Sequence, residues 1–569
     1  MKKRLLLILI AMIVWTGGAG AQDAIPTLVP PTPLPTTPSP QQDALRSQSV
    51  VAHLQTNGVV RVGILMNEPS YGQLDVRGEV VGYDADLARV LAEVWEVEVE
   101  FVQVTRQNRI DMLLQDRVDM LIATLVHDRS LDDVVEFSNS YRISRQALMV
   151  RADDAAAALQ NMVGRKIGYV IGTAADEAVQ AWLSTTGQGV QAQSYYTIDE
   201  AYRALFATEI DGIVGRLGHL RRVSVNNPEA VKILDEPVVL EPFAIAVPRQ
   251  DVAMRNLVNR TLQYLVENDT LPNLHETHFP GQDFPYDVLP VWDNLSENGP
   301  KPAEYATDIP YPSEYRAARI VFSEDRVLRV AGMPELAPDA PASQQRLLAF
   351  YQGLLTQFAE RWGARLEIVP GDPISLIESG QADLAVGVNL DWSLADRVDF
   401  SQPFLMHGDR MLIPTNRDIS GFNDLRGRWV GVISGDGDSE ARAQYWIDSI
   451  GARINLFTIN FEGNIPTTMF ETQNIDVVFG NSLRLISHVQ ADPGRLELTE
   501  RWYTRKYEAF ALPRNDIDFR LLVNYTLQAM LRDGTLANLS QPVFPSDSDF
   551  PMFDYWPGSN ENLGLSFTS

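Results

Sequence analysis

A glycine and a threonine stand where an expected strand passes into an expected helix. Residues 167–171 are β-prone, Gly172 and Thr173 follow, and residues 174–183 have the apolar spacing of a helix. The first N–H groups of a helix lack partners within it and its dipole favours negative charge, so this position suits an anion such as a carboxylate. The Thr173 hydroxyl adds one hydrogen bond. An ordinary helix N-cap is the alternative interpretation, and it is compatible with ligand contact.

The elements around this position alternate between short β-rich runs and helical runs. Strands are expected at residues 59–65, 101–104 and 120–123, and helices at residues 84–94 and 109–114. Such alternation predicts α/β layers with largely parallel sheets.

The chain contains an internal repeat. Three pairs of matching segments occur in the same order: 257–274 with 522–539, 135–138 with 398–401, and 164–173 with 427–436. Matches at a nearly constant offset indicate two copies of one unit. We place module 1 at residues 50–290 and module 2, which is more divergent, at 321–550. A linker covers 291–320 and a C-terminal tail covers 551–569.

Each module is larger than the commonest domain size, so two lobes are predicted in each. In module 1 we assign residues 50–149 and 242–290 to one lobe and residues 150–241 to the other.

Composition excludes several classes of protein. Of 569 residues, 45% are hydrophobic and 21% charged, which excludes a disordered chain and an integral membrane bundle. The net charge of -27 disfavours nucleic acid as a partner. There is no cysteine, so disulfides, thiol nucleophiles, thiolate metal sites and a lipid-bearing cysteine are excluded. We expect no metal, cofactor or catalytic residue.

The N-terminus has the pattern of a secretory signal peptide. Basic residues 1–4 precede an apolar run at 5–15, and residues 19–21 form a small-x-small cleavage site. The apolar run is short for a membrane span, although an uncleaved anchor is the alternative. Residues 22–49 are rich in proline and threonine and predict a semi-stiff spacer. We expect a protein exported to the periplasm or the cell exterior, either free or tethered to the outer face of the membrane.

Residues 82–88, Gly-Tyr-Asp-Ala-Asp-Leu-Ala, resemble the signature of the family 3 extracellular solute-binding proteins, the polar amino acid receptors of ABC importers. Further landmarks follow in the family's order at 108–110, 113–119, 135–138, 164–168 and 172–173. The resemblance covers nearly all of module 1. Module 2 keeps landmarks at Asp383, 399–404 and 425–432 and in its C-terminal helix, but residues 344–362 replace the signature with one continuous expected helix.

The resemblance implies the periplasmic-binding-protein type 2 fold, in which two α/β lobes are joined by crossing strands and hold a ligand in their cleft. It implies a monomer, not an enzyme, that captures a small carboxylate-bearing solute (an amino acid or related acid) by hinge closure for an ABC-importer permease. Two alternatives remain open. One is an enzyme similar to cyclohexadienyl dehydratase with Glu68 as its acid, and the other is a ligand-sensing partner of a membrane receptor.

The resemblance also implies positions for ligand binding in module 1. The family's carboxylate-binding arginine aligns with Leu131, and we take Arg129 as the candidate; a surface arginine is the alternative. The amine-binding aspartate aligns with Arg216, so a cation replaces an anion. Arg216 should disfavour an amine and attract a second acidic group, with Arg129 and Arg216 holding opposite ends of the ligand.

Three further residues complete the expected site of module 1. Glu68 follows the first strand and can receive an amine, as can Asn67. Tyr71 can form an aromatic wall for the ligand, with a core tyrosine as the alternative. Thr124 directly follows the expected strand at 120–123.

The corresponding positions of module 2 are altered. Trp392 matches Arg129, Asp436 matches Thr173 and Asn481 matches Arg216. An aspartate at a helix start caps the helix but repels a carboxylate. Module 2 therefore binds an uncharged or cationic solute, or has kept the fold and lost the site; we favour the second interpretation.

Overall fold

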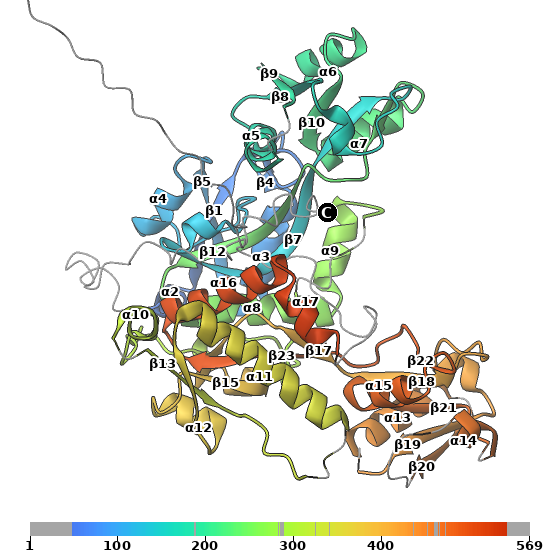
Figure 1. The fold of residues 1–569 in the computed structure, drawn as a ribbon. Helices are drawn as coiled ribbons and strands as arrows, with labels where there is room; N and C mark the ends of the chain where they lie inside the picture. Colours follow the sequence, from blue (N-terminus) through green and yellow to red (C-terminus); the bar gives the residue numbers. More distant parts are fainter. Residues whose placement is uncertain are drawn as a thin grey trace, which may run out of the picture.

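The computed structural model describes residues 48–542, apart from 187–188, 283, 285–288, 325, 339, 341, 436, 452, 460–464, 466 and 473. The expected signal peptide, nearly all of the spacer, the C-terminal tail and Asp436 lie outside the described residues. Within the part that is described, no helix is long and apolar enough to cross a membrane. Figure 1 shows module 1 in blue to green and module 2 in yellow to red.

Module 1 is built on one sheet that runs through both lobes, in the order β5-β1-β6-β12-β7-β10-β8-β9, with β11 (Val231–Ile233) beside β7. Lobe 1 holds β1 (Val59–Leu65), β5 (Glu98–Val104) and β6 (Met120–Leu121), and lobe 2 holds β8 (Lys166–Val170), β9 (Gln191–Tyr195) and β10 (Gly212–Arg216). The long strands β7 (Val135–Arg151) and β12 (Val239–Pro248) pair antiparallel and connect the lobes. The expected α/β fold with crossing strands is confirmed.

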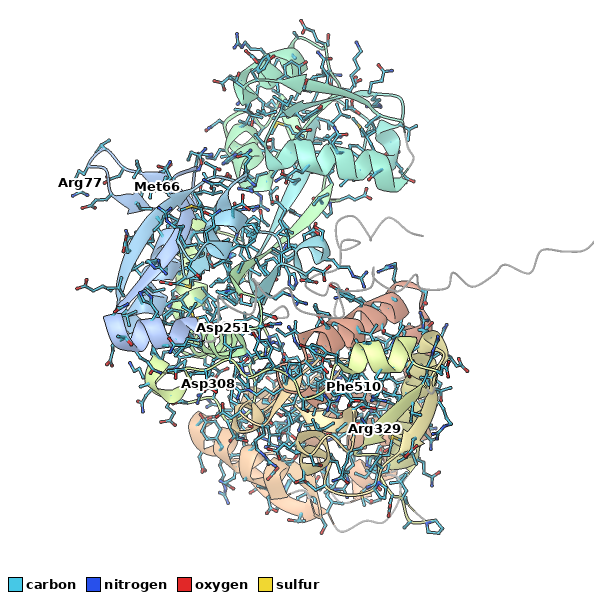
Figure 2. The ribbon with its side chains drawn as sticks, turned by 90° about the vertical axis from the view of Figure 1, so that its left-hand side faces the viewer. Met66, Arg77, Asp251, Asp308, Arg329 and Phe510 are labelled. Carbon is cyan, nitrogen blue, oxygen red and sulfur yellow. The ribbon has the colours of Figure 1, made fainter. Side chains whose placement is uncertain are left out.

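Helices cover both faces of this sheet (Figure 1). Lobe 1 carries α2 (Val50–Asn57), α3 (Tyr83–Trp95), α4 (Arg109–Leu114), α8 (Val252–Glu267) and α9 (Thr270–His278), and lobe 2 carries α5 (Ala174–Thr186), α6 (Ile198–Phe206) and α7 (Leu217–Asn226). A small sheet of β2 (Asn67–Glu68), β3 (Gly72–Leu74) and β4 (Val80–Val81) lies at the edge of lobe 1, where Figure 2 labels Met66 and Arg77. The predicted strands and helices of module 1 are confirmed to within a few residues.

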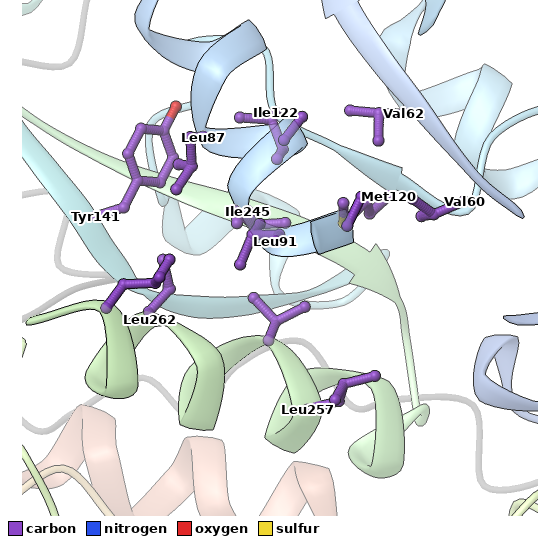
Figure 3. Packing of buried hydrophobic residues seen from close by; sticks show 14 of the residues in the cluster. Val60, Val62, Leu87, Leu91, Met120, Ile122, Tyr141, Ile245, Leu257 and Leu262 are labelled. Atoms are coloured by element: carbon purple, nitrogen blue, oxygen red, sulfur yellow. The ribbon is translucent and has the colours of Figure 1, made fainter. Parts of the chain in front are cut away.

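The core of lobe 1 explains why these elements form. In α3, Leu87 and Leu91 stand one helical turn apart and are fully buried. They belong to one cluster with Val62 of β1 and Leu257 of α8, as Figure 3 shows. The buried residues of β1 and the apolar residues at helical spacing in α3 and α8 therefore meet in a single core.

Module 2 has two sheets in place of one. The first has the order β14-β13-β15-β23-β16 with β17 beside β23, and the second has the order β20-β19-β21-β18-β22. The strands of the first are β13 (Val327–Ala331), β14 (Arg365–Ile368), β15 (Leu384–Asn389), β16 (Val398–Phe400), β17 (Leu405–His407) and β23 (Lys506–Pro513); those of the second are β18 (Asp409–Pro414), β19 (Trp429–Ile433), β20 (Asn455–Ile459), β21 (Val477–Asn481) and β22 (Leu496–Leu498). The main helices are α11 (Ala342–Trp362), α12 (Pro373–Glu378), α13 (Gly437–Ile450), α14 (Thr467–Thr472), α15 (Ser482–Ala491), α16 (Ile517–Arg532) and α17 (Thr535–Ser540). The continuous helix expected in place of the signature is α11.

The expected linker packs against both modules. Trp292 stacks on Trp392 with ring centroids 4.2 Å apart, and Lys301 Nζ lies 2.7 Å from Glu96 Oε1. Its last part forms α10 (Arg316–Phe322). Near the middle of the linker, Asp308 and Gln48 form an isolated antiparallel β-bridge. This bridge lies close to Asp251, which caps the start of α8 (Figure 2). The linker is therefore part of the folded body.

Four buried charges join the modules at equivalent places of the repeat. Arg255 in α8 lies 2.7 Å from Asp399 of module 2, and Arg520 in α16 lies 2.6 Å from Glu136 of module 1. Arg520 is also 3.2 Å from Asp399, and Arg255 is 3.7 Å from Glu136. We call these four residues the interface charge cluster. Each module thus supplies one arginine and one carboxylate, in a pseudo-symmetric arrangement.

Candidate functional site

The charged residues predicted from the sequence meet between the lobes of module 1. Arg216 ends β10 in lobe 2, and its Nη1 forms an ion pair with Oε1 of Glu68 in β2 of lobe 1. The other Glu68 oxygen accepts a hydrogen bond of 2.8 Å from Arg106, and Arg216 Nε lies 3.5 Å from Glu241 Oε2 in β12. We call Glu68, Arg106, Arg216 and Glu241 the interlobe site.

These charges determine one another's protonation. Burial alone would raise the pKa of Glu68, but Arg216 and Arg106 outweigh it, so the pKa of Glu68 is lowered. Burial alone would lower the pKa of Arg216, but Glu241 and Glu68 outweigh it and raise that pKa. Glu68 is therefore ionised at neutral pH, which makes it a poor proton donor for an elimination reaction.

Arg216 retains donors for a further anion. Its side chain is 7% exposed, and its Nε and Nη2 have no hydrogen-bond partner among the described residues. The guanidinium carbon lies 5.0 Å from the ring centroid of Tyr71 and 5.4 Å from that of Phe243. Because Nε already lies 3.5 Å from Glu241, Nη2 is the open donor, and a guanidinium held on aromatic rings in this way is suited to bind a carboxylate.

Tyr71 is primarily a core residue. Its ring is 2% exposed and packs against Phe279 at a centroid distance of 5.3 Å, and its hydroxyl accepts a 2.9 Å hydrogen bond from Arg142. Tyr71 therefore packs as a core tyrosine, which was the alternative interpretation. Its ring also contacts the guanidinium of Arg216.

Thr124 is held by the aspartate of the signature segment. Its N–H donates a 2.9 Å hydrogen bond to Asp84, and its backbone has a φ of 44°. The hydroxyl of Tyr141 donates to the other Asp84 oxygen at 3.0 Å. Burial raises the pKa of Asp84 to about 6. Asp84 thus fixes the backbone at Thr124, a positioning role that sequence reasoning missed.

At the start of α5, local groups already use the backbone donors. Gly172, with a φ of 73°, donates its N–H to Asp176 at 3.0 Å. The Thr173 hydroxyl donates to Val170 O at 2.7 Å and accepts from the N–H of Ala175 at 3.3 Å. This is the N-cap arrangement that the sequence analysis left open. A ligand carboxylate would have to compete with Asp176 for the Gly172 N–H.

Arg129 does not join the interlobe site. Its guanidinium carbon lies 3.6 Å from the ring centroid of Tyr525 in α16, so Arg129 contributes to the contact between modules. The expectation that Arg129 and Arg216 hold opposite ends of a ligand is therefore corrected. The physical reason is docking: Tyr525, far away in sequence, offers an aromatic face for the cation.

Two arginines near the start of α4 were not among the site residues predicted from the sequence, and one of them, Arg106, belongs to the interlobe site. Arg106 pairs with Glu68, and Arg109 donates a 2.8 Å hydrogen bond to Ala123 O. Burial lowers the pKa of Arg109 to about 10. Two arginines directly after a strand were a visible signal in the sequence, whereas nothing in the sequence marked Glu241.

In module 2, the residues that match the site are arranged differently. Trp392 stacks on Trp292 and donates a 2.7 Å hydrogen bond to Gln263 of module 1, so its expected place in the cleft is corrected to the contact between modules. Asn481 caps α15 by accepting from the N–H of Leu483, and its amide lies 3.0 Å from His407 Nδ1.

Module 2 also holds a buried carboxylate near Asn481 and His407. Glu508 of β23 hydrogen-bonds with Tyr351 and lies 3.5 Å from His407. Burial raises the pKa of Glu508 to about 7, and burial lowers the pKa of His407 to about 4.

Glu508→Gln is expected to stabilise the protein in alkaline solution. Because the pKa of Glu508 is higher in the folded state than in the unfolded state, folding stability from this group falls as pH rises from its unfolded pKa towards about 7. Removing the buried charge should raise the free energy of unfolding at higher pH by about 1–3 kcal/mol and have little effect in acid. Melting curves across this pH range measure the effect, with Glu497→Gln on β22 as an exposed control. An equal change at every pH would contradict the assignment.

The comparisons with known proteins agree with the tandem organisation. The sequence profile of the bacterial extracellular solute-binding proteins, family 3, matches residues 60–281 and 337–546, once in each module. The glutamine-binding protein of Geobacillus stearothermophilus is 26% identical over 176 residues, which are 30% of this chain and 66% of that protein. The ABC transporter arginine-binding protein 1 of Escherichia coli (strain K12) is 22% identical over 225 residues, 39% of this chain and 90% of that protein. A solved structure of an ancestral arginine-binding protein bound to arginine is 26% identical, with 39% of this chain and 99% of that chain covered and a TM-score of 0.33.

Proposed function

Because this chain belongs to the family 3 bacterial extracellular solute-binding proteins, we propose that module 1 captures a small carboxylate-bearing solute between its lobes, with Arg216 as the principal ligand-binding residue. The solute is an amino acid or a related acid. Binding without turnover is the proposed activity, and the lowered pKa of Glu68 supports it.

The observation that carries this proposal is the state of Arg216. It is buried between the lobes, and its Nη2 has no hydrogen-bond partner among the described residues, while Glu68 of the other lobe contacts Nη1 and Glu241 lies 3.5 Å from Nε. A solute carboxylate would take the open Nη2 donor and compete with Glu68 and Glu241, and a solute amine would take the released Glu68 oxygen. A ligand that contacts both lobes stabilises the closed arrangement by its differential affinity for the two states.

We place the protein outside the cytoplasmic membrane, where as a monomer it delivers its solute to the permease of an ABC importer. The names of its relatives, a glutamine-binding protein and an arginine-binding protein, support an amino acid or a related compound. Module 2 retains the fold without the charged contacts of the interlobe site, and we propose that it does not bind a carboxylate.

A thermal-shift screen of the full chain tests this function. Amino acids, dicarboxylates and sugars are compared, because a ligand that binds only the folded state raises the melting temperature; at a hundredfold excess over Kd the gain is about 2.7 kcal/mol. A carboxylate-bearing solute should produce the shift, Arg216→Gln should reduce it, and the matched module 2 variant Asn481→Ala should retain it in full. A shift with sugars alone would show that the solute class is wrong.

Thr173→Ala tests the start of α5. If the hydroxyl turns from Val170 to the bound carboxylate, the variant should bind the solute more weakly by about 1.5–3 kcal/mol, the value of a hydrogen bond to a charged group. Thr173→Ser keeps the hydroxyl and should bind normally. Calorimetry measures affinity, and melting curves separately record the loss of the helix cap. Unchanged affinity in Thr173→Ala would assign Thr173 to capping alone.

A further inference from the structure

A second, strongly basic pocket lies beside the interlobe site. It has a volume of about 770 Å³, and its walls come from lobe 1 (residues 69–71 and 278–282), strand β7 (142–145) and lobe 2 (within 216–226). Helices α7 and α9, which both supply lining residues, lie on the same side of β7 (Figure 1). Five arginines line it, and none of its described lining residues is an aspartate or a glutamate. In a chain with a net charge of -27, such a concentration of positive charge calls for an explanation.

The deepest of these arginines, Arg142, is 3% exposed and has only neutral partners among the described residues. Its Nε donates to the Tyr71 hydroxyl at 2.9 Å, its Nη2 donates to Gln282 at 3.1 Å, and its Nη1 lies 3.1 Å from His275 Nδ1. Its guanidinium carbon lies 3.5 Å from the ring centroid of Phe279. These contacts satisfy hydrogen bonds without neutralising the charge, and a buried charge without a counter-ion is costly.

Three further arginines add positive charge to the same pocket. Arg145, Arg221 and Arg222 form no ion pair with any carboxylate in the described part of the chain, and all three line the pocket. Burial and the neighbouring Arg221 outweigh the attraction of Asp235 and lower the pKa of Arg145. The fold thus holds cations together that repel each other, and an anion between them would relieve this repulsion.

Arg216 lies at the boundary between this pocket and the interlobe site. It contacts Glu68 and Glu241, so it belongs to the interlobe site. The positive charge of the pocket itself therefore comes from Arg142, Arg145, Arg221 and Arg222.

We propose that this pocket binds a small polyanion, a solute or ion with two or more negative charges, at a site distinct from the amino acid site between the lobes. Guanidinium groups bind carboxylate and phosphate oxygens alike through paired N–H donors, so the shared chemistry is a cluster of anionic oxygens. Because the walls of the pocket come from both lobes and from β7, a bound polyanion contacts both lobes beside the connecting strands. It therefore shifts the equilibrium between the open and closed arrangements of the lobes.

Calorimetric titration of the full chain at fixed pH and ionic strength tests the proposal, with citrate and inorganic phosphate as probes and chloride as the reference. The double variant Arg221→Gln/Arg222→Gln removes two exposed charges from the pocket. The double variant Arg117→Gln/Arg203→Gln removes two exposed charges elsewhere and is the matched control. We expect the pocket variant to bind at least about tenfold more weakly, since removing a single charge-assisted hydrogen bond weakens binding by about that factor. The control should bind as the wild type does.

Stronger binding of citrate would identify the ligand as a polycarboxylate, and stronger binding of phosphate would identify it as a phosphoryl compound. Melting curves establish that each variant is folded, and Arg145→Gln provides a second pocket variant. The proposal fails if neither probe binds above chloride, or if both double variants lose affinity equally. Neither Arg221 nor Arg222 belongs to the interlobe site, so this result does not depend on the proposed solute capture.

Discussion

Arg216→Asp is expected to reverse the solute preference of module 1. In the wild type, a cation stands at the position that aligns with the family's amine-binding aspartate, so a solute with a second acidic group, or without an amine, should bind better than a plain monoamino monocarboxylic acid. The substitution adds a third carboxylate beside Glu68 and Glu241. Like charges in a partly desolvated site repel strongly, and a solute amine then becomes the favoured partner. We expect the affinity for an acidic solute to fall by about 2–5 kcal/mol relative to that for a zwitterion.

Calorimetry with glutamate, glutamine and succinate measures this reversal. Arg203→Asp, which makes the same charge change on the exposed face of α6 in lobe 2, is the matched control and should keep the wild-type ranking. Arg216→Gln removes the cation without adding an anion, so the affinities for the three solutes should become more alike. This variant provides a test if the aspartate variant folds poorly. Identical rankings in all three variants would show that Arg216 does not contact the solute.

Arg520→Met is expected to cause a large loss of stability at the contact between modules. The substitution leaves Glu136 and Asp399 to share Arg255, and all three side chains are about 5% exposed. Removing one partner from a buried ion cluster typically costs about 3–5 kcal/mol, because an uncompensated charge remains. Denaturant unfolding of the full chain measures the loss.

Two further variants separate this effect from a general loss of charge. Arg514→Gln removes an arginine paired with the exposed Asp396, and the expected cost is about 0–1 kcal/mol. The double variant Arg520→Met/Glu136→Gln removes a cation and an anion together and should recover part of the stability. If Arg520→Met costs no more than Arg514→Gln, the cluster does not stabilise the contact.

The same cluster predicts sensitivity to acid. Burial would raise the pKa of Asp399, but Arg255 and Arg520 outweigh it and hold that pKa below its usual value. The contribution of Asp399 to stability is therefore present above its unfolded pKa and is lost as pH falls through the lower folded pKa. The same denaturant unfolding, repeated at successively lower pH, measures this decline.

Much of the fold could be predicted because its signals are local. The helix at α3, the replacement helix α11 and the cap before α5 each depend on residues within a few helical turns. The repeat was visible as paired segments, and Arg255 and Arg520 occupy matching positions within it. Hydrophobic spacing and capping are recorded in neighbouring residues, so the sequence by itself determined the elements and the two-module organisation.

Tertiary structure decided which charged and aromatic groups meet. Arg129 and Trp392 occupy matching positions in the two modules, and both lie at the contact between modules because Tyr525 and Trp292 face them there. The contact of Arg216 with Glu68 joins residues from different lobes. The partner of a charge depends on how lobes and modules dock, and that arrangement is the sum of many contacts between residues hundreds of positions apart. The sequence by itself therefore determined that a cation stands at position 216, and only the tertiary structure decided which carboxylates surround it and that further arginines gather beside it.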